Sequence, residues 1–92
     1  MKIIWLTNAR YDLKALRDYL ACENPRIAAK ITKQVVDTLQ HLTEHPEMGR
    51  PGRIHNTREL IVSGTPYIIP YRVMNNTIEV LRVLHGAMQW PM

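Results

Sequence analysis

Several features are scarce in this sequence of 92 residues, and each absence removes a class of protein. Cys22 is the single cysteine, so the chain can form no internal disulfide and no cysteine-rich zinc module. A reducing cytoplasm suits such a chain, and we expect a cytoplasmic protein. The segment from Met1 to Leu6 is too short for the apolar region of a signal peptide. No apolar run approaches the roughly 20 residues of a membrane-spanning helix, so we expect no membrane association.

Phosphate-binding and metal-binding signatures are also absent from the sequence. The four glycines form no glycine-rich phosphate loop, and we find neither an internal repeat nor a low-complexity tract. His41 and His45 lie four residues apart near the end of an expected helix, but no third metal ligand is evident. A favourable interaction with the helix dipole explains the two histidines more simply. We therefore expect no metal and no cofactor.

The size and charge of the chain indicate a small basic domain. A chain of 92 residues has room for one core, so we expect a single domain over residues 1–92. Apolar residues make up 46% and charged residues 22%, as in ordinary globular proteins. The net charge of +4 suits a polyanion or an acidic protein partner, although a solvated basic face would give the same balance.

The first half of the sequence predicts a strand followed by two helices. Residues 2–6 are short, apolar and β-branched, which is typical of a buried strand. Thr7 and Asn8 are suitable helix caps, and an apolar stripe of helical spacing follows at Ala9, Leu13, Leu16 and Leu20. Asn24-Pro25 ends this helix and begins a second one that runs to about residue 44. Because the link is so short, we expect an antiparallel helical hairpin.

The second half predicts three strands after a loop over residues 46–53. The period changes to two, and we expect strands over residues 58–63, 67–73 and 77–84. A tight turn at Asn75-Asn76 pairs residues whose numbers sum to 151, so that Arg72 faces Glu79. Because proline has no N–H to donate, we expect a local break or bulge at Pro70.

These elements give an α+β fold of order β-α-α-β-β-β. A helical hairpin is expected to cover one face of a small, mostly antiparallel sheet. The first strand could pair with either of two neighbours, so the order of strands in the sheet stays open.

A set of short segments forms one pattern along nearly the whole chain. In order they are Trp5 with Ala9 and Asp12-Leu13, Asn24-Pro25 with Ala28-Ala29, Leu42 to Pro46 with Gly49-Arg50, Thr57-Arg58-Glu59-Leu60, Pro66-Tyr67-Ile68-Ile69 with Tyr71-Arg72-Val73, Arg82-Val83-Leu84-His85-Gly86, and Gln89-Trp90-Pro91. This pattern resembles the RelE/ParE family of bacterial type II toxins, which are carried with antitoxins. One branch of the family cuts messenger RNA on the ribosome, and the ParE-like branch poisons DNA gyrase.

RNA cleavage would need cations for the phosphate and groups that carry protons. If the chain is a nuclease, the candidate catalytic residues are Arg58, Arg72, Arg82 and His85. Further proton carriers would be Glu59, Tyr67 and Tyr71. If it is a binding protein, the candidate partner-binding residues are Arg50, Arg53, Arg58, Gln89 and Trp90.

Simpler structural roles are open for several of these residues. Arg72 can be neutralised by Glu79, and Arg82, which the predicted register places opposite Ile69, can form a structural ion pair. His85 can be an ordinary histidine at a strand end. Trp90 can close the core or anchor a partner.

The resemblance favours the gyrase branch because two nuclease positions differ here. Ile68 occupies the place where nuclease members usually carry an arginine, and the chain end has Trp90 in place of a tyrosine or histidine. We therefore expect a ParE-like inhibitor of DNA gyrase, with a RelE-like, ribosome-dependent endoribonuclease as the alternative. A third hypothesis is a non-toxic family member that only binds its antitoxin and, together with it, represses its own operon. The resemblance implies an antitoxin partner that folds onto an apolar groove, and operator DNA is expected to be bound only through that antitoxin.

Overall fold

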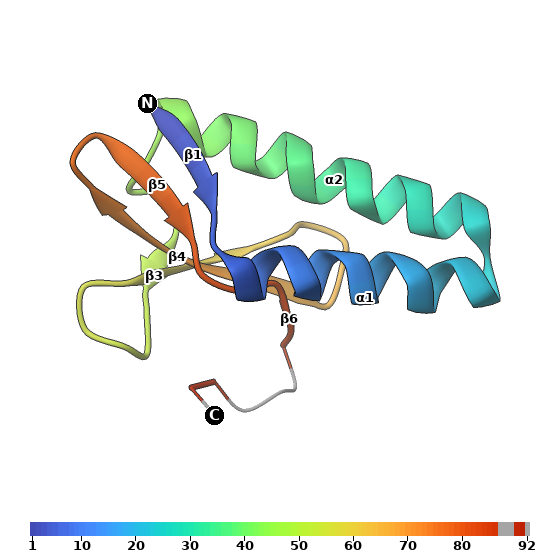
Figure 1. Cartoon of the computed structure of the whole chain (residues 1–92). Coiled ribbons are helices and arrows are strands. Elements are labelled where there is room, and N and C mark those ends of the chain that lie inside the picture. Colours follow the sequence, from blue (N-terminus) through green and yellow to red (C-terminus); the bar gives the residue numbers. More distant parts are fainter. Residues whose placement is uncertain (87–89, 92) are drawn as a thin grey trace.

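The chain folds into two layers, a helical hairpin and a six-stranded sheet, in the computed structural model, which describes residues 1–86, 90 and 91 (Figure 1). In chain order the elements are β1 (Lys2–Trp5), α1 (Thr7–Glu23), α2 (Pro25–Glu44), β2 (Arg50–Pro51), β3 (Arg58–Ile61), β4 (Tyr67–Met74), β5 (Thr77–Val80) and β6 (Leu84–His85). The expected α+β class and the order β-α-α-β-β-β are confirmed, with two short strands, β2 and β6, added. None of the helices in the described ranges is long and apolar enough to cross a bilayer.

Asn24 joins the two helices and caps the second one, as expected. Its side-chain Oδ1 accepts hydrogen bonds from the backbone N–H groups of Arg26 and Ile27, at 3.0 and 3.3 Å. The expected capping of α1 by Thr7 or Asn8 is wrong. Leu6 occupies the cap position, and its apolar side chain offers no cap hydrogen bond. Its N–H donates to Val80 O of the sheet at 3.0 Å, so the helix begins directly after β1.

The strand order is β1-β5-β4-β3-β2, which answers the question left open by the sequence. β1 lies parallel to β5, and the other pairs are antiparallel. The predicted register between β4 and β5 is confirmed, with Arg72 opposite Glu79 and Val73 opposite Ile78. β1 thus joins the sheet at the far side of the last hairpin, where the short β1–α1 connection places α1 over the same face as α2.

The break expected at Pro70 is present, and it divides the strand predicted over residues 77–84. Pro70 O accepts a hydrogen bond from Leu81 N at 2.9 Å, but proline has no N–H to return. β5 therefore ends at Val80, and the chain pairs with β4 again only from Leu84, which lies opposite Ile68. The register shifts by one residue across this break. The predicted position of Arg82 opposite Ile69 is therefore wrong.

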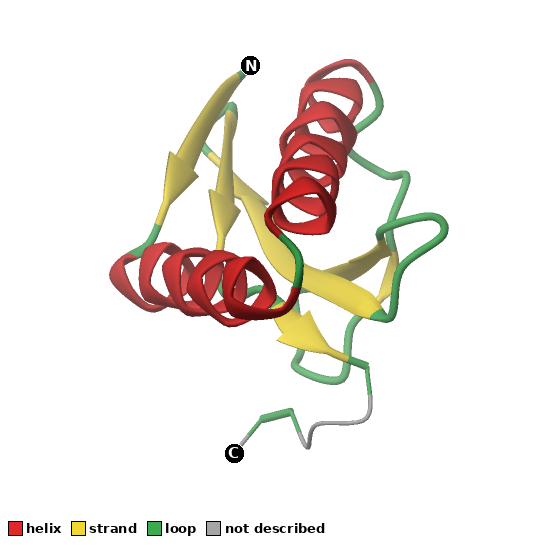
Figure 2. Cartoon of the chain, turned by 90° about the vertical axis from the view of Figure 1, so that its right-hand side faces the viewer, coloured by secondary structure: helices red, strands yellow, loops and turns green. Residues whose placement is uncertain are grey.

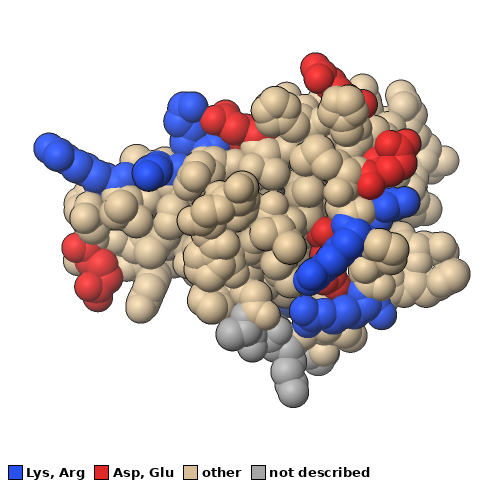
Figure 3. Space-filling model, turned by 180° about the vertical axis from the view of Figure 1, so that it is seen from behind, with Lys and Arg blue, Asp and Glu red and all other residues tan. Residues whose placement is uncertain are grey.

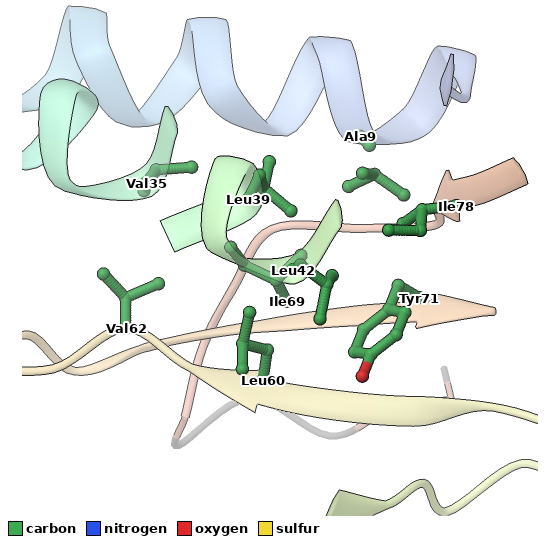
Figure 4. Packing of buried hydrophobic residues seen from close by; sticks show 10 residues of the cluster. Ala9, Val35, Leu39, Leu42, Leu60, Val62, Ile69, Tyr71 and Ile78 are labelled. Carbon is green, nitrogen blue, oxygen red and sulfur yellow. The ribbon is translucent and has the colours of Figure 1, made fainter. Parts of the chain in front are cut away.

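The core lies between the hairpin and one face of the sheet. Figure 4 shows Val35, Leu39 and Leu42 of α2 pointing toward side chains of β3 and β4. Together the central buried residues are Ala9, Val35, Leu39, Leu42, Leu60, Val62, Ile69, Tyr71, Ile78 and Val80. Figure 2 views the hairpin from the end at which its two helices join. Since alternate strand residues point to opposite faces, the neighbours of these core residues, such as Glu59, Arg72 and Met74, project from the face away from the helices.

Candidate functional site

Glu59 is the centre of an arginine cluster on the face of the sheet away from the helices. Only 2% of this residue is exposed. Its Oε2 accepts the backbone N–H of Arg53 at 3.0 Å, and its Oε1 lies 3.2 Å from Arg50 Nη2 and 3.7 Å from Arg53 Nε. A buried carboxylate is costly unless it is paired and hydrogen-bonded, and this one is both. Two partly exposed guanidinium groups share one carboxylate, so the cluster stays positive.

β2 explains how these groups meet. Composition predicted only a loop over residues 46–53, but Arg50 and Pro51 pair with Glu59 and Arg58 of β3. This pairing sets Arg50 directly opposite Glu59, and the next turn of chain returns the backbone of Arg53 to the same carboxylate. β2 consists only of Arg50 and Pro51, which have no strong preference for a strand. The pairing of β2 with β3 was therefore not predictable from the sequence.

Arg58 and Tyr71 fix the segment that leads into β2. Arg58 Nη1 donates to the carbonyl oxygens of Gly49 and Glu47, at 2.8 and 3.2 Å. The Tyr71 hydroxyl donates to Pro46 O at 2.7 Å and accepts from Gly49 N at 2.9 Å. Burial raises the pKa of this hydroxyl, which therefore stays protonated and able to donate at neutral pH. A Cβ on Gly49 would lie 2.7 Å from the Tyr71 ring, so only glycine fits there.

A hollow of about 750 Å³ opens beside this cluster, and we call it the arginine hollow. It is lined by Pro51, Ile54, His55, Asn56, Thr57, Arg58, Arg72, Val73, Met74 and Leu81. The lining combines Arg72 and Arg58 with aliphatic residues and contains no carboxylate among the described residues. Arg72 projects from the face away from the helices, whereas Arg58 lies opposite Tyr71 and directs its guanidinium to the helix side. On the face shown in Figure 3, basic and acidic side chains gather toward the ends of the molecule, with an uncharged area between them.

Arg72 and Arg82 both form ion pairs with carboxylates. Arg72 Nε bonds Glu79 Oε1 across β4 and β5, as the predicted register requires. Arg82 binds Asp12 of α1 through two contacts, Nε to Oδ2 at 2.6 Å and Nη2 to Oδ1 at 3.0 Å. Hydrogen bonding to Asp12 raises the pKa of the Arg82 guanidinium. Arg82 thus ties the break between β5 and β6 to the first helix.

Asp12 also accepts the backbone N–H of Val83 at 3.0 Å, so one carboxylate satisfies three donors. Sequence reasoning did not connect Asp12 with Arg82, which lies 70 residues further along the chain. The position of Asp12 just off the apolar stripe of α1 was the available signal, because a carboxylate there points toward the edge of the sheet.

His85 lies at the other end of β4 from the arginine hollow. It pairs with Tyr67, and the two rings form an edge-to-face contact with centroids 5.8 Å apart. Arg72 lies five residues further along β4, about 16 Å away at roughly 3.3 Å per residue. Side chains alternate along a strand, so Tyr67 and Arg72 point to opposite faces of the sheet. His85, opposite Tyr67, therefore points away from the face that carries Arg72.

The structure thus brings together only part of the predicted nuclease set. Arg58 and Arg72 line one hollow. Arg82 is instead bound to Asp12, and His85 lies at the opposite end of β4 from the hollow. The other predicted proton carriers do not complete the set. Glu59 and the Tyr71 hydroxyl are occupied by hydrogen bonds, and burial raises the pKa of Tyr67 above its usual value. Among the described residues, no group of three or more His, Cys, Asp or Glu side chains could hold a metal ion.

The predicted partner-binding residues near the chain end are described only in part. Gln89 lies outside the described residues. The carbonyl of Trp90 accepts a hydrogen bond from Arg53 Nη1 at 3.4 Å, which connects the end of the chain to the Glu59 cluster. Trp90 lines a second hollow of about 490 Å³ with Leu6, Leu81 and Arg82. Trp90 is half-buried in this position, so part of it faces solvent.

Known proteins resemble this chain along nearly its whole length. Residues 3–90 match the family described as the ParE toxin of the type II toxin–antitoxin system parDE. The chain is 39% identical over 90 residues to a protein named as toxin Y4kP of Sinorhizobium fredii, covering 98% of this chain and 93% of that protein. It is 33% identical over 86 residues to toxin RelE2 of Caulobacter vibrioides, covering 94% and 96%. Among solved structures, a chain of the chromosomal ParDE system of P. aeruginosa superposes with a TM-score of 0.81 at 28% identity, covering 92% and 95%.

Proposed function

The chain belongs to the ParE toxin family of type II toxin–antitoxin systems, and from this premise we propose that it inhibits DNA gyrase. Its action is then that of a binding protein, because an inhibitor of this kind needs a shaped surface and no proton-transfer pair. The proposed contact residues are Arg50 and Arg53 of the Glu59 cluster, Arg58 at the same edge of the sheet, and Trp90 near the chain end. Gln89, which the sequence also proposes, lies outside the described residues.

One observation carries this proposal, the separation of the groups that RNA cleavage would need. Arg72 lies about 16 Å along β4 from Tyr67, the residue opposite His85, and Tyr67 and Arg72 point to opposite faces of the sheet. A general acid or base has to lie within hydrogen-bond reach of the proton that it moves. Another candidate cation, Arg82, is held by Asp12 through two contacts inside the chain.

An antitoxin is the expected stable partner of a toxin of this type. The P. aeruginosa neighbour comes from a ParDE toxin–antitoxin system, which supports the same kind of partner here. We propose that this antitoxin neutralises the toxin and that operator DNA is bound only through it. The proposed site of action is the cytoplasm, where gyrase works.

The alternative function is that of a ribosome-dependent endoribonuclease. The relative named RelE2 favours it, as do the two arginines that line one hollow beside His55. In this alternative Arg58 and Arg72 would bind the phosphate of the messenger, and His85 would have to be brought to the same site.

The deciding experiment compares both targets with one preparation of purified toxin. A gyrase supercoiling assay is run beside ribosomes programmed with a defined messenger. Loss of supercoiling with an intact messenger supports the gyrase proposal. A cut messenger with unchanged supercoiling refutes it and directs attention to Arg58, Arg72, Arg82 and His85.

A further inference from the structure

We propose that the arginine hollow receives a segment of the target protein in which an apolar side chain is flanked by carboxylates. This inference rests on the proposed function, since it assigns the surface with which the toxin grips its target. The hollow lies on the face of the sheet away from the helical hairpin, where Arg72 and Met74 project from β4.

The apolar part of the hollow is open to solvent. Met74, at the end of β4, lines the hollow, is 50% exposed and projects from the same face as Arg72. Val73 lines the hollow too, but its side chain points to the helix face, opposite Ile78. Ile54 and Leu81 are half-buried on the remaining sides. Aliphatic surface that gathers around one concavity gains free energy when an apolar side chain of a partner covers it.

The charges around the hollow favour an acidic occupant. Arg58 lies at the edge of the hollow with its guanidinium on the helix side, where it donates to main-chain carbonyl oxygens that leave its charge uncancelled. Arg72 uses Nε for Glu79, and this contact holds the guanidinium in place across the two strands. Arg53, on the segment that forms one wall, adds a further partly exposed cation. Paired arginines of this kind suit carboxylates, which accept bidentate hydrogen bonds.

The wall formed by residues 51–57 is fixed before any partner binds. Gly52 N donates to Thr57 O at 2.8 Å, and the Thr57 hydroxyl donates to Ile54 O. The buried carboxylate of Glu59 anchors the same segment through the N–H of Arg53. A preformed wall reduces the ordering cost of binding, so the surface can bind more tightly for its size.

A protein segment fits this lining better than a single-stranded nucleic acid does. Strands of RNA or DNA bind by stacking successive bases on aromatic side chains. The described lining of the hollow offers the imidazole of His55 and no Tyr or Trp ring. Aliphatic side chains between arginines instead match an apolar residue with acidic neighbours.

The first test places a negative charge at the lip of the hollow through Met74→Glu. Because Met74 is exposed at a strand end, the variant should fold, which its urea midpoint verifies. We expect the toxin concentration that halves gyrase supercoiling to rise about tenfold or more, as for the loss of a central interface contact. The matched control is Val36→Glu, which introduces the same charge at a 43% exposed residue of α2 and should inhibit gyrase as the wild type does.

A second variant tests the charge of the hollow without removing an ion pair. The double substitution Arg72→Glu with Glu79→Arg keeps opposite charges across β4 and β5 but places the carboxylate in the lining. We expect it to weaken inhibition by about as much as Met74→Glu does. Inhibition at wild-type level by either variant overturns the proposal.

Growth arrest in cells separates this inference from the gyrase proposal. If the wild type arrests growth but leaves supercoiling unchanged, gyrase is the wrong target. The hollow is then supported if Met74→Glu abolishes arrest, and overturned if that variant still arrests growth. A wild type that does not arrest growth contradicts both proposals. A titration with a single-stranded RNA oligonucleotide completes the test, because RNA binding that Met74→Glu alone removes would make the occupant a nucleic acid and overturn our proposal.

Discussion

Replacing Tyr71 by phenylalanine should reveal how strongly the core holds the segment that leads into the arginine cluster. The substitution keeps the buried ring and removes the hydroxyl that bonds both Pro46 O and Gly49 N. Losing an ordinary hydrogen bond costs about 1 kcal/mol net, whereas leaving a buried donor without any partner costs about 1–3 kcal/mol in all. Gly49 is buried, so its N–H becomes such a donor, whereas Pro46 is half-buried and can bind water. We expect the free energy of unfolding to fall by about 2–3 kcal/mol.

Urea denaturation of the purified toxin measures this change. For a chain of 92 residues, the expected loss corresponds to a fall in Tm of about 10–20 °C. Tyr11→Phe is the matched control, because that ring is 68% exposed on α1 and its hydroxyl loss should leave the midpoint unchanged. A loss below about 0.5 kcal/mol for Tyr71→Phe would refute the reasoning, since it would mean that the hydroxyl contributes no net hydrogen bonding.

The same pair of proteins should differ in alkaline stability. Burial raises the pKa of Tyr71 in the folded state above the usual value near 10. Its contribution is therefore fully present below about pH 10 and is lost as the pH rises through the folded pKa. The stability advantage of the wild type over Tyr71→Phe should shrink above about pH 10, as urea midpoints measured at several pH values would show.

Two further substitutions and one truncation test the ion pair of Asp12, the absence of nuclease activity and the role of the chain end. Asp12→Ala leaves Arg82 and the N–H of Val83 without their carboxylate in a mostly buried place. The free energy of unfolding, measured in urea, should fall by about 2–3 kcal/mol. An unchanged urea midpoint would contradict a stabilising role of Asp12. Ile68→Arg puts a cation at a position that is 5% exposed, so it should cost about 3 kcal/mol or more and create no messenger cleavage on ribosomes; a cut messenger would refute it. A chain truncated before Gln89 loses Trp90 and should no longer arrest growth, while it still co-purifies with its antitoxin; a toxic truncation would count against a role of this end in target binding.

Local patterns were sufficient to predict most of the elements. The helical spacing of apolar residues and the Asn24-Pro25 pair predicted the hairpin, since capping and periodicity act within a few residues. The turn at Asn75-Asn76, where both residues have positive φ, fixed the register of β4 against β5. The missing N–H of Pro70 predicted a break, although the sequence could not show that the chain would resume pairing at Leu84.

The candidate site was predictable only as a list of residue types. The arginines and His85 were visible as candidates, but their separation depends on the order of strands and on the face to which each residue points. Nothing in the sequence pattern around Glu59 indicates that this residue is buried. Its burial results from pairing with β2, a strand of two residues that no local propensity predicts. The capping of α1 failed for a similar reason, because a contact of Leu6 with the distant Val80 decided where the helix begins.

Local sequence patterns were sufficient for the class of fold, the hairpin, the register of β4 against β5 and the membership of a toxin family. These depend on periodicity, turns and motif order, which are encoded between near neighbours. Tertiary structure alone decided which charges meet. Asp12 and Arg82 are 70 residues apart, and Arg50, Arg53 and Glu59 converge only when β2 pairs with β3. Electrostatic contacts act through space between side chains that folding brings together, so the arginine hollow and its charge exist only in the folded chain.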